Sequence, residues 1–484
     1  MVLNDLRYGL RLLLHRPSFA VIAIVTLAVG IGANTAIFTV VDRVVLRAVP
    51  FPEPHRLVVV WETNPNLPVP VMVASPPTLH DWQTRNRTFE AVGAFRWRSV
   101  TLSGVGDPEQ IRGATVTAPL LRALAVQPQR GRLFREEDDR AGAPPVILIS
   151  DGLWRRRFTT SHGVLGQRVS VDGVSHEIVG VMPPGYQAPP PIVFRGHPPA
   201  DRAELWIPLA IDLAAGQRGA HNLTVVARLR RGVAIETADS DVKRIAAEVA
   251  SEHPDYRDWN ARVAPLAGWV TESSRRSMAL LAAAAGCVLL LACANVANLL
   301  LARGVGRRRE LAIRMALGAG RRRLAVQVIA ESLALALTGG IAGLVLATGL
   351  IQLIVTRGPA TIPGVREATL DMRALTFAVA VSVASAILAG VVPAVRLMRA
   401  RLTCWLTDRG VGTGRGAIRV QKTLVVVQVA FAMALLVSAS LLVESFRQLR
   451  AVDPGFRPEH VVTGKLVLPA ARYSDAAART AFVN

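Results

Sequence analysis

Five long runs of apolar residues without a single charge divide this chain. The runs are 17–41, 278–302, 332–356, 374–395 and 423–443. A helix needs about 20 predominantly apolar residues to cross the hydrocarbon of a bilayer. Helices buried in a soluble core rarely reach such lengths without a charge, so the pattern predicts five membrane-spanning helices.

The composition agrees with a membrane protein. Hydrophobic residues make up 51% of the chain and the mean hydropathy is +0.35, whereas ordinary globular chains are roughly 45–50% apolar with glycine included. The first run could instead be a signal peptide, but its apolar stretch is longer than a typical signal core. The following GIGANTAIFTVVDRVV has no small-residue cleavage site, so we expect a retained signal anchor.

The charge distribution predicts the topology. The net charge of +21 would suit a nucleic-acid partner, but the segment 42–277 holds 29 basic and 25 acidic residues. The pieces 1–18, 303–323 and 396–422 together hold 18 basic and three acidic residues. Short loops rich in Lys and Arg stay in the cytoplasm and are attracted to anionic lipid head groups. No nucleic-acid motif accompanies the charge, so we expect membrane lipids and no nucleic acid as partners.

These observations predict an order of segments along the chain, beginning with a cytoplasmic N-terminus. The predicted segments are an amphipathic helix (1–18), the first span (17–41), a large exported domain (42–277), the second span (278–302), a cytoplasmic loop (303–323), the third span (324–356), an external loop (357–373), the fourth span (374–395), a cytoplasmic linker (396–422), the fifth span (423–443) and the start of a second soluble domain (444–484). The last segment is too short to fold alone, so we expect either a truncated second unit or a tail that docks on the first domain.

The arginine-rich loop is the most informative of these segments. Residues 302–323 read ARGVGRRRELAIRMALGAGRRR, with eight arginines and one acid. The central ELAIRMALGA is apolar on one helical face and ends at glycine, as a short surface helix does. Such a helix between two spans suits a cytoplasmic partner. The alternative is an arginine cluster that only fixes the orientation in the membrane.

The exported segment carries signals of both strands and helices. VILIS and VVARLRRG have the composition of strands, and VSVDG followed by EIVGVM predicts a hairpin. TADSDVKRIAAEVASEHP has the apolar spacing of a helix and predicts one with a polar cap at its start. The large aromatic residues are expected in the core rather than in a ligand site: Trp82, Phe89, Trp154, Phe158 and Trp206.

Cysteine and histidine positions give no metal or disulfide site. The exported segment has no cysteine, so its stability must come from an apolar core. Cys287 and Cys293 lie in the second span, and Cys404 lies in the cytoplasmic linker. The histidines of the exported segment that we considered as ligands are scattered without ligand spacing: His80, His162 and His221.

Catalytic motifs are absent from the sequence. Gly464 and Lys465 lack the upstream glycine and the following Ser or Thr of a phosphate-binding loop. The glycines of GIGANTAIF lie inside a span and lack the third glycine of a dinucleotide site. Neither HExxH nor GxSxG occurs. We therefore expect no catalytic residues, no metal and no cofactor, and a chain that is not itself an enzyme.

Polar residues within the spans are few. Glu331 lies near the cytoplasmic end of the third span, where it could snorkel or pair with a loop arginine. Asn295 and Asn298 in the second span are expected to form hydrogen bonds between helices. Nothing in the sequence lines a polar route through the membrane.

Small residues predict where helices approach closely. Gly339, Gly343 and Ala347 follow one another at four-residue spacing on one face of the third span. Such a face lets two helix backbones come together in the membrane. Pro393 is expected to kink the fourth span.

The sequence resembles the MacB/FtsX type of ABC transporter permeases, in particular the duplicated orphan permease group. The resemblance covers essentially the whole chain. It is carried by the opening LRYGLRLLLHRPSFAVIAIVTLAVGIGANTAIFTVVDRVVLRAVPFPEPHRLV, by ACANVANLLLARGVGRRRELAIRMALGAGRRRLAVQVIAESLALALTGGIAGL, and between them by PEQIRG, GRLF, EEDD, VILISDGLWRRRF, LGQRV, IVGVMPPG and LWIPLA.

This resemblance implies a polytopic α-helical membrane protein with a large mixed α+β periplasmic domain, the MacB-like periplasmic core. It also implies a bacterial inner-membrane location. The duplicated group repeats its unit, and QKTLVVVQVAFAMALLVSASLLVESFRQLRAVDPGF resembles the start of a second unit. The missing remainder of that unit is the main departure, and a dimer or pseudo-dimer of permease units is expected.

The resemblance also implies a mechanism. The permease pairs with a cytoplasmic ABC ATPase, whose ATP-driven dimerisation is transmitted through the membrane helices to the periplasmic domain for export or efflux. The loop helix matches the family's ATPase contact region. Its apolar contacts are assigned to Ile313, Met315, Ala316 and Leu317, its polar contacts to Arg309, Glu310 and Arg314, and its turn to Gly318.

Two other functions remain open from the sequence. A channel-type or secondary transporter would need buried charges or broken helices around a cavity, which the sequence does not contain. A membrane-anchored sensor or scaffold without an ATPase would need none of these features. Co-purification with an ATPase separates this last hypothesis from the permease.

The topology predicts thiol accessibility. A single cysteine introduced at Ser161 should react with an impermeant reagent in intact cells whose outer membrane has been permeabilised, because 42–277 is expected outside the cytoplasm. Reaction only after lysis would contradict the orientation.

Overall fold

The computed structural model describes most of the chain and divides it into two compact units. The described residues are 17–47, 49–158, 163–186, 188, 203–306, 320–357, 365, 368–399 and 414–452. The membrane unit comprises 1–46 and 274–461, and the soluble unit comprises 47–273 with 462–484. Each unit is described by itself.

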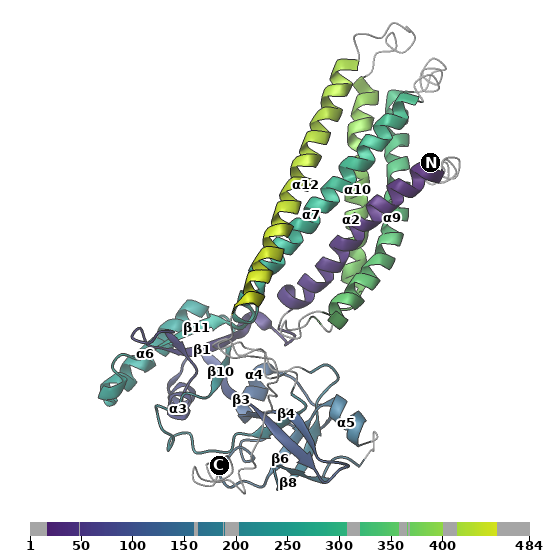
Figure 1. The fold of residues 1–484 in the computed structure, drawn as a ribbon. Coiled ribbons are helices and arrows are strands. Elements are labelled where there is room, and N and C mark those ends of the chain that lie inside the picture. The colour runs from purple at the N-terminus through teal and green to yellow at the C-terminus, as the bar shows by residue number, and fades with distance from the viewer. Residues whose placement is uncertain are drawn as a thin grey trace. The chain divides into compact units, whose positions relative to one another are not determined.

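The membrane unit is built from long helices that lie side by side (Figure 1). They are α2 (Pro17–Val41), α7 (Leu266–Gly306), α9 (Arg321–Arg357), α10 (Met372–Arg399) and α12 (Gly414–Ala451). Among the described residues, five helices are long and apolar enough to cross a membrane, and the five predicted uncharged runs lie within them. A π-helix, η1 (Asp42–Leu46), continues α2.

Several predicted segments lie outside the described residues. They are the N-terminal amphipathic helix up to residue 16, the centre of the arginine-rich loop (307–319), most of the linker (400–413) and the tail from 453 onward. The predicted sidedness and segment boundaries therefore stay predictions.

Two apolar clusters hold α2 against its neighbours. In the first cluster, Leu27 and Ile31 of α2 pack with Leu335 of α9, and with residues of α7 and α10. In the second, Val40 of α2 packs with Ile351 of α9. The α9 helix thus contacts both α2 and α10 along much of its length, whereas α2 and α10 contact each other over a smaller area.

The soluble unit is organised around one mixed sheet. Its strands are β1 (Leu57–Thr63), β2 (Val71–Met72), β3 (Phe89–Ser103), β4 (Glu109–Val116), β5 (Arg130–Gly131), β6 (Val146–Ile149), β7 (Arg168–Val171), β8 (Val174–Val181), β9 (Leu205–Pro208), β10 (Thr224–Leu229) and β11 (Asn260–Pro265). The order across the sheet is β11-β1-β10-β3-β4-β9-β6-β8-β5, with β2 beside β1 and β7 beside β3 and β8.

Strand β1 lies in the middle of the core because both of its faces are covered. Val59 and Trp61 face a cluster that contains α4 (Ala118–Leu124). Val58 and Val60 face a cluster with α3 (Pro76–Arg85) and α6 (Ile235–Glu252). A strand that is buried on both sides needs a continuous apolar run, and LVVVW supplies it.

The long strand β3 links two parts of the unit. Its first half pairs with β10 and its second half pairs with β4 and β7. Val100 and Leu102 near its end enter a third cluster, which also contains Leu153 and Trp154 of α5 (Asp151–Arg157). The sheet therefore carries separate apolar cores at its two ends.

The predicted elements of the soluble unit are confirmed. The hairpin is formed by β7 and β8, and its two-residue turn has Asp172 and Gly173 at positive φ, as this type of turn requires. VILIS contains β6, and VVARLRRG contains all of β10 except Thr224. The predicted helix contains most of α6, but the helix begins two residues earlier, after Ala234, and the expected side-chain cap is absent. The aromatic residues predicted for the core are all buried: Trp82, Phe89, Trp154, Phe158 and Trp206.

The edge strand β11 is protected on its free side. The Val263 amide donates to Asp239 of α6 at 2.9 Å, and the Ala261 amide donates to the Asn260 side chain at 2.8 Å. Pro265 has no amide hydrogen to offer. Edge strands with free donors recruit other strands, and these three positions offer none.

Candidate functional site

The residues predicted to contact an ATPase lie outside the described residues. This holds for Arg309, Glu310, Ile313, Arg314, Met315, Ala316, Leu317 and Gly318. Their assignment stays a prediction from the sequence. The described helices α7 and α9 flank this loop on either side.

The small residues predicted to pack in α9 lie against α2. A Cβ atom at Gly339 would come 2.7 Å from the Leu27 Cβ atom, and one at Gly343 would come 3.1 Å from the Gly32 nitrogen. In the opposite direction, a Cβ atom at Gly32 would come 2.7 Å from the Gly343 oxygen. Ala347 is fully buried. The two backbones therefore touch directly, and no larger side chain fits between them.

Glycine and serine form a second close contact, between α9 and α10. A Cβ atom at Gly340 of α9 would clash with the Ser382 hydroxyl of α10. A Cβ atom at Gly390 of α10 would come 2.9 Å from the Ser332 hydroxyl of α9. Ser332 donates to the Val328 carbonyl at 2.9 Å. The serine hydroxyls thus satisfy their polar groups within their own helix while small residues let the helices approach.

The two asparagines of α7 differ in their surroundings. The Asn298 amide nitrogen donates to the Gln428 side-chain oxygen of α12 at 3.3 Å. Asn295 is exposed on the surface of α7. An asparagine that was not predicted, Asn34 of α2, donates to the Ala285 carbonyl of α7 at 2.7 Å. Side-chain amides therefore connect α7 both to α12 and to α2.

Several buried hydroxyls in the described spans donate to the backbone of their own helix. Thr35 and Thr39 of α2 donate to carbonyls four residues earlier at 2.8 Å each, and Ser385 of α10 does the same at 2.7 Å. Glu331 is buried, and Gln327 of the same helix approaches its Oε1 at 3.5 Å. These hydroxyls serve the helix backbone, so they are not arranged to bind a passing solute.

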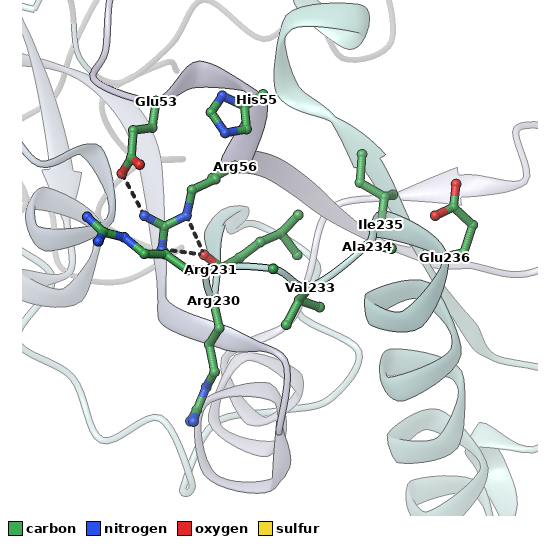
Figure 2. A pocket seen from close by; sticks show the side chains of 11 residues that line it. Glu53, His55, Arg56, Arg230, Arg231, Val233, Ala234, Ile235 and Glu236 are labelled. Carbon is green, nitrogen blue, oxygen red and sulfur yellow. Dashed lines mark hydrogen bonds and ion pairs between the residues drawn. The ribbon is translucent and has the colours of Figure 1, made fainter.

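A pocket of about 500 Å³ opens on the soluble unit beside η2 (Pro54–Arg56) and the start of α6 (Figure 2). The buried Arg56 lines this pocket. It donates to the Leu229 carbonyl at 2.7 Å and to the Glu53 carboxylate at 2.6 Å, and it also pairs with Glu90. Burial by itself lowers the pKa of Arg56, but the two carboxylates raise it above its ordinary value. Arg56 therefore cross-links Glu53, Glu90 and the Leu229 carbonyl, and most of its donors are used within the protein.

A buried ion pair joins three segments of the soluble unit. His221 Nδ1 lies 2.6 Å from the Glu62 carboxylate of β1, and the side chains are 12% and 3% exposed. His221 Nε2 lies 3.4 Å from the Tyr256 hydroxyl of η3 (Pro254–Tyr256), which donates to the Arg218 carbonyl. The imidazole also stacks on Trp259 at 4.4 Å. A doubly protonated imidazole satisfies both of its nitrogens here.

The charges around His221 set its protonation. Burial by itself lowers its pKa, but the hydrogen bond and the negative charge of Glu62 raise it above its ordinary value, with a further contribution from the Val73 carbonyl. Burial raises the pKa of Tyr256, which stays neutral. The Arg218 guanidinium is paired with Asp81 of α3 at 2.8 Å. Within the described residues, no group of three or more His, Cys, Asp or Glu side chains is placed to hold a metal ion.

Sequence reasoning missed most of these contacts because their partners are distant in the chain. Gly32 belongs to GIGANTAIF, where only a nucleotide motif was considered. His221 has no neighbour in sequence with which to form a site, and it meets Glu62 only because β10 follows it and pairs with β1. A signal that could have been used is the uncharged, glycine-rich face of α2, which matches that of α9.

Two family models match the chain one after the other. The model of the MacB-like periplasmic core domain matches residues 20–245, from within α2 into α6. The model of the FtsX-like permease C-terminal matches residues 282–402, which include most of α7 together with α9 and α10. The two matches therefore fall on the soluble unit with its preceding span and on the membrane helices that follow.

Curated relatives match about half of this chain. The macrolide export ATP-binding/permease protein MacB of Bdellovibrio bacteriovorus is 24% identical over 249 residues, which are 51% of this chain and 36% of that protein. The protein of the same name from Wolinella succinogenes is 27% identical over 232 residues, 46% of this chain and 33% of that protein. The chain thus spans only about a third of the length of these relatives.

Solved structures that match part of this chain resemble it weakly. The periplasmic region of MacB from Actinobacillus actinomycetemcomitans covers 48% of this chain and 95% of its own, at 10% identity and a TM-score of 0.32. The extracellular domain of the ABC-type transporter YknZ from Gram-positive bacteria covers 42% and 98%, at 14% identity and a TM-score of 0.30.

The contact between α2 and α9 predicts a strong effect of side-chain size. Replacing Gly343 with isoleucine should destabilise the chain by about 1–3 kcal/mol, because overpacking forces the two backbones apart. Gly349→Ile in the same helix is the matched control, since a Cβ atom there meets nothing within 4 Å. Thermal unfolding in detergent would measure both, and equal midpoints would contradict the close contact.

The pair of His221 and Glu62 predicts a pH dependence of the soluble unit. The folded-state pKa of His221 is raised, so its contribution to stability is fully present below the ordinary histidine pKa of about 6.5 and is lost as pH rises through the raised value. Urea-dependent pulse proteolysis of the full chain in membranes should therefore give a lower midpoint at about pH 8.5 than at about pH 6.

Substitutions test whether this pair is the cause. His221→Gln should cost about 1–3 kcal/mol at pH 6 by leaving Glu62 without its partner, and it should flatten the pH profile. Combining it with Glu62→Gln should restore part of the loss without restoring the pH dependence. His55→Gln, at an exposed position, is the control. An unchanged pH profile in His221→Gln would refute the assignment.

Proposed function

We propose that this chain, which belongs to the MacB/FtsX type of permeases, transmits ATP-driven movement from a cytoplasmic ABC ATPase to its soluble domain. In this proposal the soluble domain lies on the periplasmic side of a bacterial inner membrane and the N-terminus lies inside. The movement serves export or efflux. Membership of the duplicated orphan group remains a prediction from the sequence.

The observation that carries the proposal is the tandem order of the two family matches. A periplasmic core domain at 20–245 is followed by an FtsX-like permease region at 282–402. The chain passes from the membrane unit to the soluble unit between residues 46 and 47, and it returns between residues 273 and 274. Movement of α2 and α7 is thereby tied covalently to the soluble unit.

The packing of the described spans supports transmission rather than conduction. A secondary transporter places broken helices and polar groups around a cavity near the middle of the membrane. Here α2, α9 and α10 meet through glycine and serine, and the buried hydroxyls donate within their own helices. Helices packed this closely are expected to move together, which suits transmission of movement better than conduction of a solute.

The partner contact is proposed for the arginine-rich loop between α7 and α9. Its sequence is apolar on one helical face and basic around it, which fits a cleft that takes an amphipathic helix. The contact between Asn298 and Gln428 attaches α12 to α7. We infer that α12 occupies the position of a neighbouring permease unit, in keeping with a dimer or pseudo-dimer.

The coupling loop gives a direct test of the proposal. Replacing Leu317 with aspartate should abolish recovery of an ABC ATPase in pull-downs from native membranes, because burying an unpaired charge at an interface costs several kcal/mol. Insertion into the membrane should be unaffected, since the spans are unchanged. Recovery is compared at equal abundance of the chain in the membrane.

The control places the same charge elsewhere. Val174→Asp changes a half-exposed residue of the soluble unit, and it should leave ATPase recovery intact. Equal recovery with Leu317→Asp and wild type would exclude docking through this face. Failure to recover any ATPase with the wild-type chain would instead favour a membrane-anchored scaffold or sensor.

A further inference from the structure

Two side-chain contacts join the C-terminal end of α2 and the start of η1 to the N-terminal end of α10. Phe38 of α2 stacks on Phe377 of α10, with ring centroids 4.0 Å apart and an angle of 4° between the planes. Asp42 at the start of η1 lies 3.7 Å from the Arg373 guanidinium near the start of α10. Both pairs are offset by four residues, so they lie one turn apart along each helix.

The surroundings of Asp42 make this contact more than a surface ion pair. The Asp42 side chain is 3% exposed, whereas that of Arg373 is 65% exposed. A buried carboxylate is costly unless a positive or hydrogen-bonding partner faces it, and Arg373 is one such partner. Asp371 fixes the beginning of α10 by accepting from the Arg373 and Ala374 amides at 3.1 and 3.0 Å. Arg373 is therefore held where it can reach Asp42.

The backbone at Asp42 differs from the rest of its helix. Residues Asp42–Leu46 form a π-helix that follows directly on α2. Such wide turns are rare in proteins, and those that do occur are often found at functional sites. The chain enters the soluble unit immediately afterwards, at Arg47. The conformation of η1 therefore sets the direction in which the connection at Arg47 leaves the membrane unit.

The packing of α2 differs between its middle and the end that carries η1. Gly32 touches the α9 backbone at Gly343, and apolar side chains pack in separate clusters on either side of that point. A change at one end of α2 can thus turn the helix about this contact. The contacts to α10 oppose such a turn at the end that carries η1.

We propose that Asp42, Arg373, Phe38 and Phe377 form a latch that holds η1 to α10, and that its release is a step in coupling the membrane helices to the soluble domain. The proposal rests on the transmission function proposed above. It assigns these four side chains a positioning role, because they act on the connection at Arg47.

Hydrogen–deuterium exchange of the full chain in lipid nanodiscs tests the latch without an ATPase. Asp42→Asn keeps the side-chain shape, Arg373→Gln shortens the side chain, and each removes one charge. Each should speed exchange of the amides at 42–46 by roughly tenfold, and the double variant should show no more than either single change, because contacting residues are not additive. Phe38→Leu, which removes the ring stack, should act in the same direction.

A control variant and a second readout separate the latch contact itself from its role in coupling. Arg357→Gln makes the same charge change at the exposed end of α9 and should leave exchange at 42–46 unchanged. Additive effects of the two single changes, or effects no larger than that of Arg357→Gln, overturn the latch. The second readout is the rate of ATP hydrolysis by the ATPase recovered in the pull-down. The wild-type chain should raise this rate, and the latch variants should lose at least half of that increase.

The outcomes are distinguishable from a failure of the transmission function itself. If exchange responds as expected while ATPase stimulation equals that of wild type, the coupling role of the latch is refuted and the transmission function stands. If the wild-type chain stimulates no ATPase, the transmission function fails and with it the coupling role. The contact itself is then decided by the exchange data alone.

Discussion

The backbone contact between Gly32 of α2 and Gly343 of α9 is the constraint on which the membrane unit depends. Lipid tails are as apolar as leucine, so spans gain little by hiding apolar side chains from their surroundings. They associate through close van der Waals packing, which small residues permit. The glycine and serine contacts between α9 and α10 repeat the same solution. Asn34 then ties α7 to this three-helix core through the Ala285 carbonyl.

The soluble unit solves the opposite problem, since water drives its apolar residues inward. Strand β1 supplies alternating side chains to cores on both of its faces, and the long strand β3 extends the sheet to a third core. The unit has no cysteine, so these cores carry its stability. The ion pair of Glu62 with His221 joins the end of β1 to the segment before β10, and its carboxylate raises the pKa of the imidazole.

The sequence predicted those features that depend on local composition. The five spans follow from runs without a charge, and the β7–β8 hairpin follows from an Asp-Gly turn between alternating strands. The glycine face of α9 was also predicted, but its partner on α2 was not, because nothing local tells which helix a face will meet. The same reason explains His221: its spacing to other ligand residues is uninformative, and only the pairing of β1 with β10 brings it to Glu62.

The distribution of polar groups along the described spans suggests where this protein can change conformation. In the middle of the spans, hydroxyls such as those of Thr35 and Ser382 are satisfied within their own helix, and packing against glycine allows one arrangement. Charged side chains occur near helix ends, as Asp42 does beside Arg373. There, water reaches Arg373, which is 65% exposed, while the cost of opening the pair falls on the buried Asp42 carboxylate. A bundle with a fixed centre and exchangeable contacts at its ends can turn without coming apart, which is the physical requirement for a helix that transmits movement across a membrane.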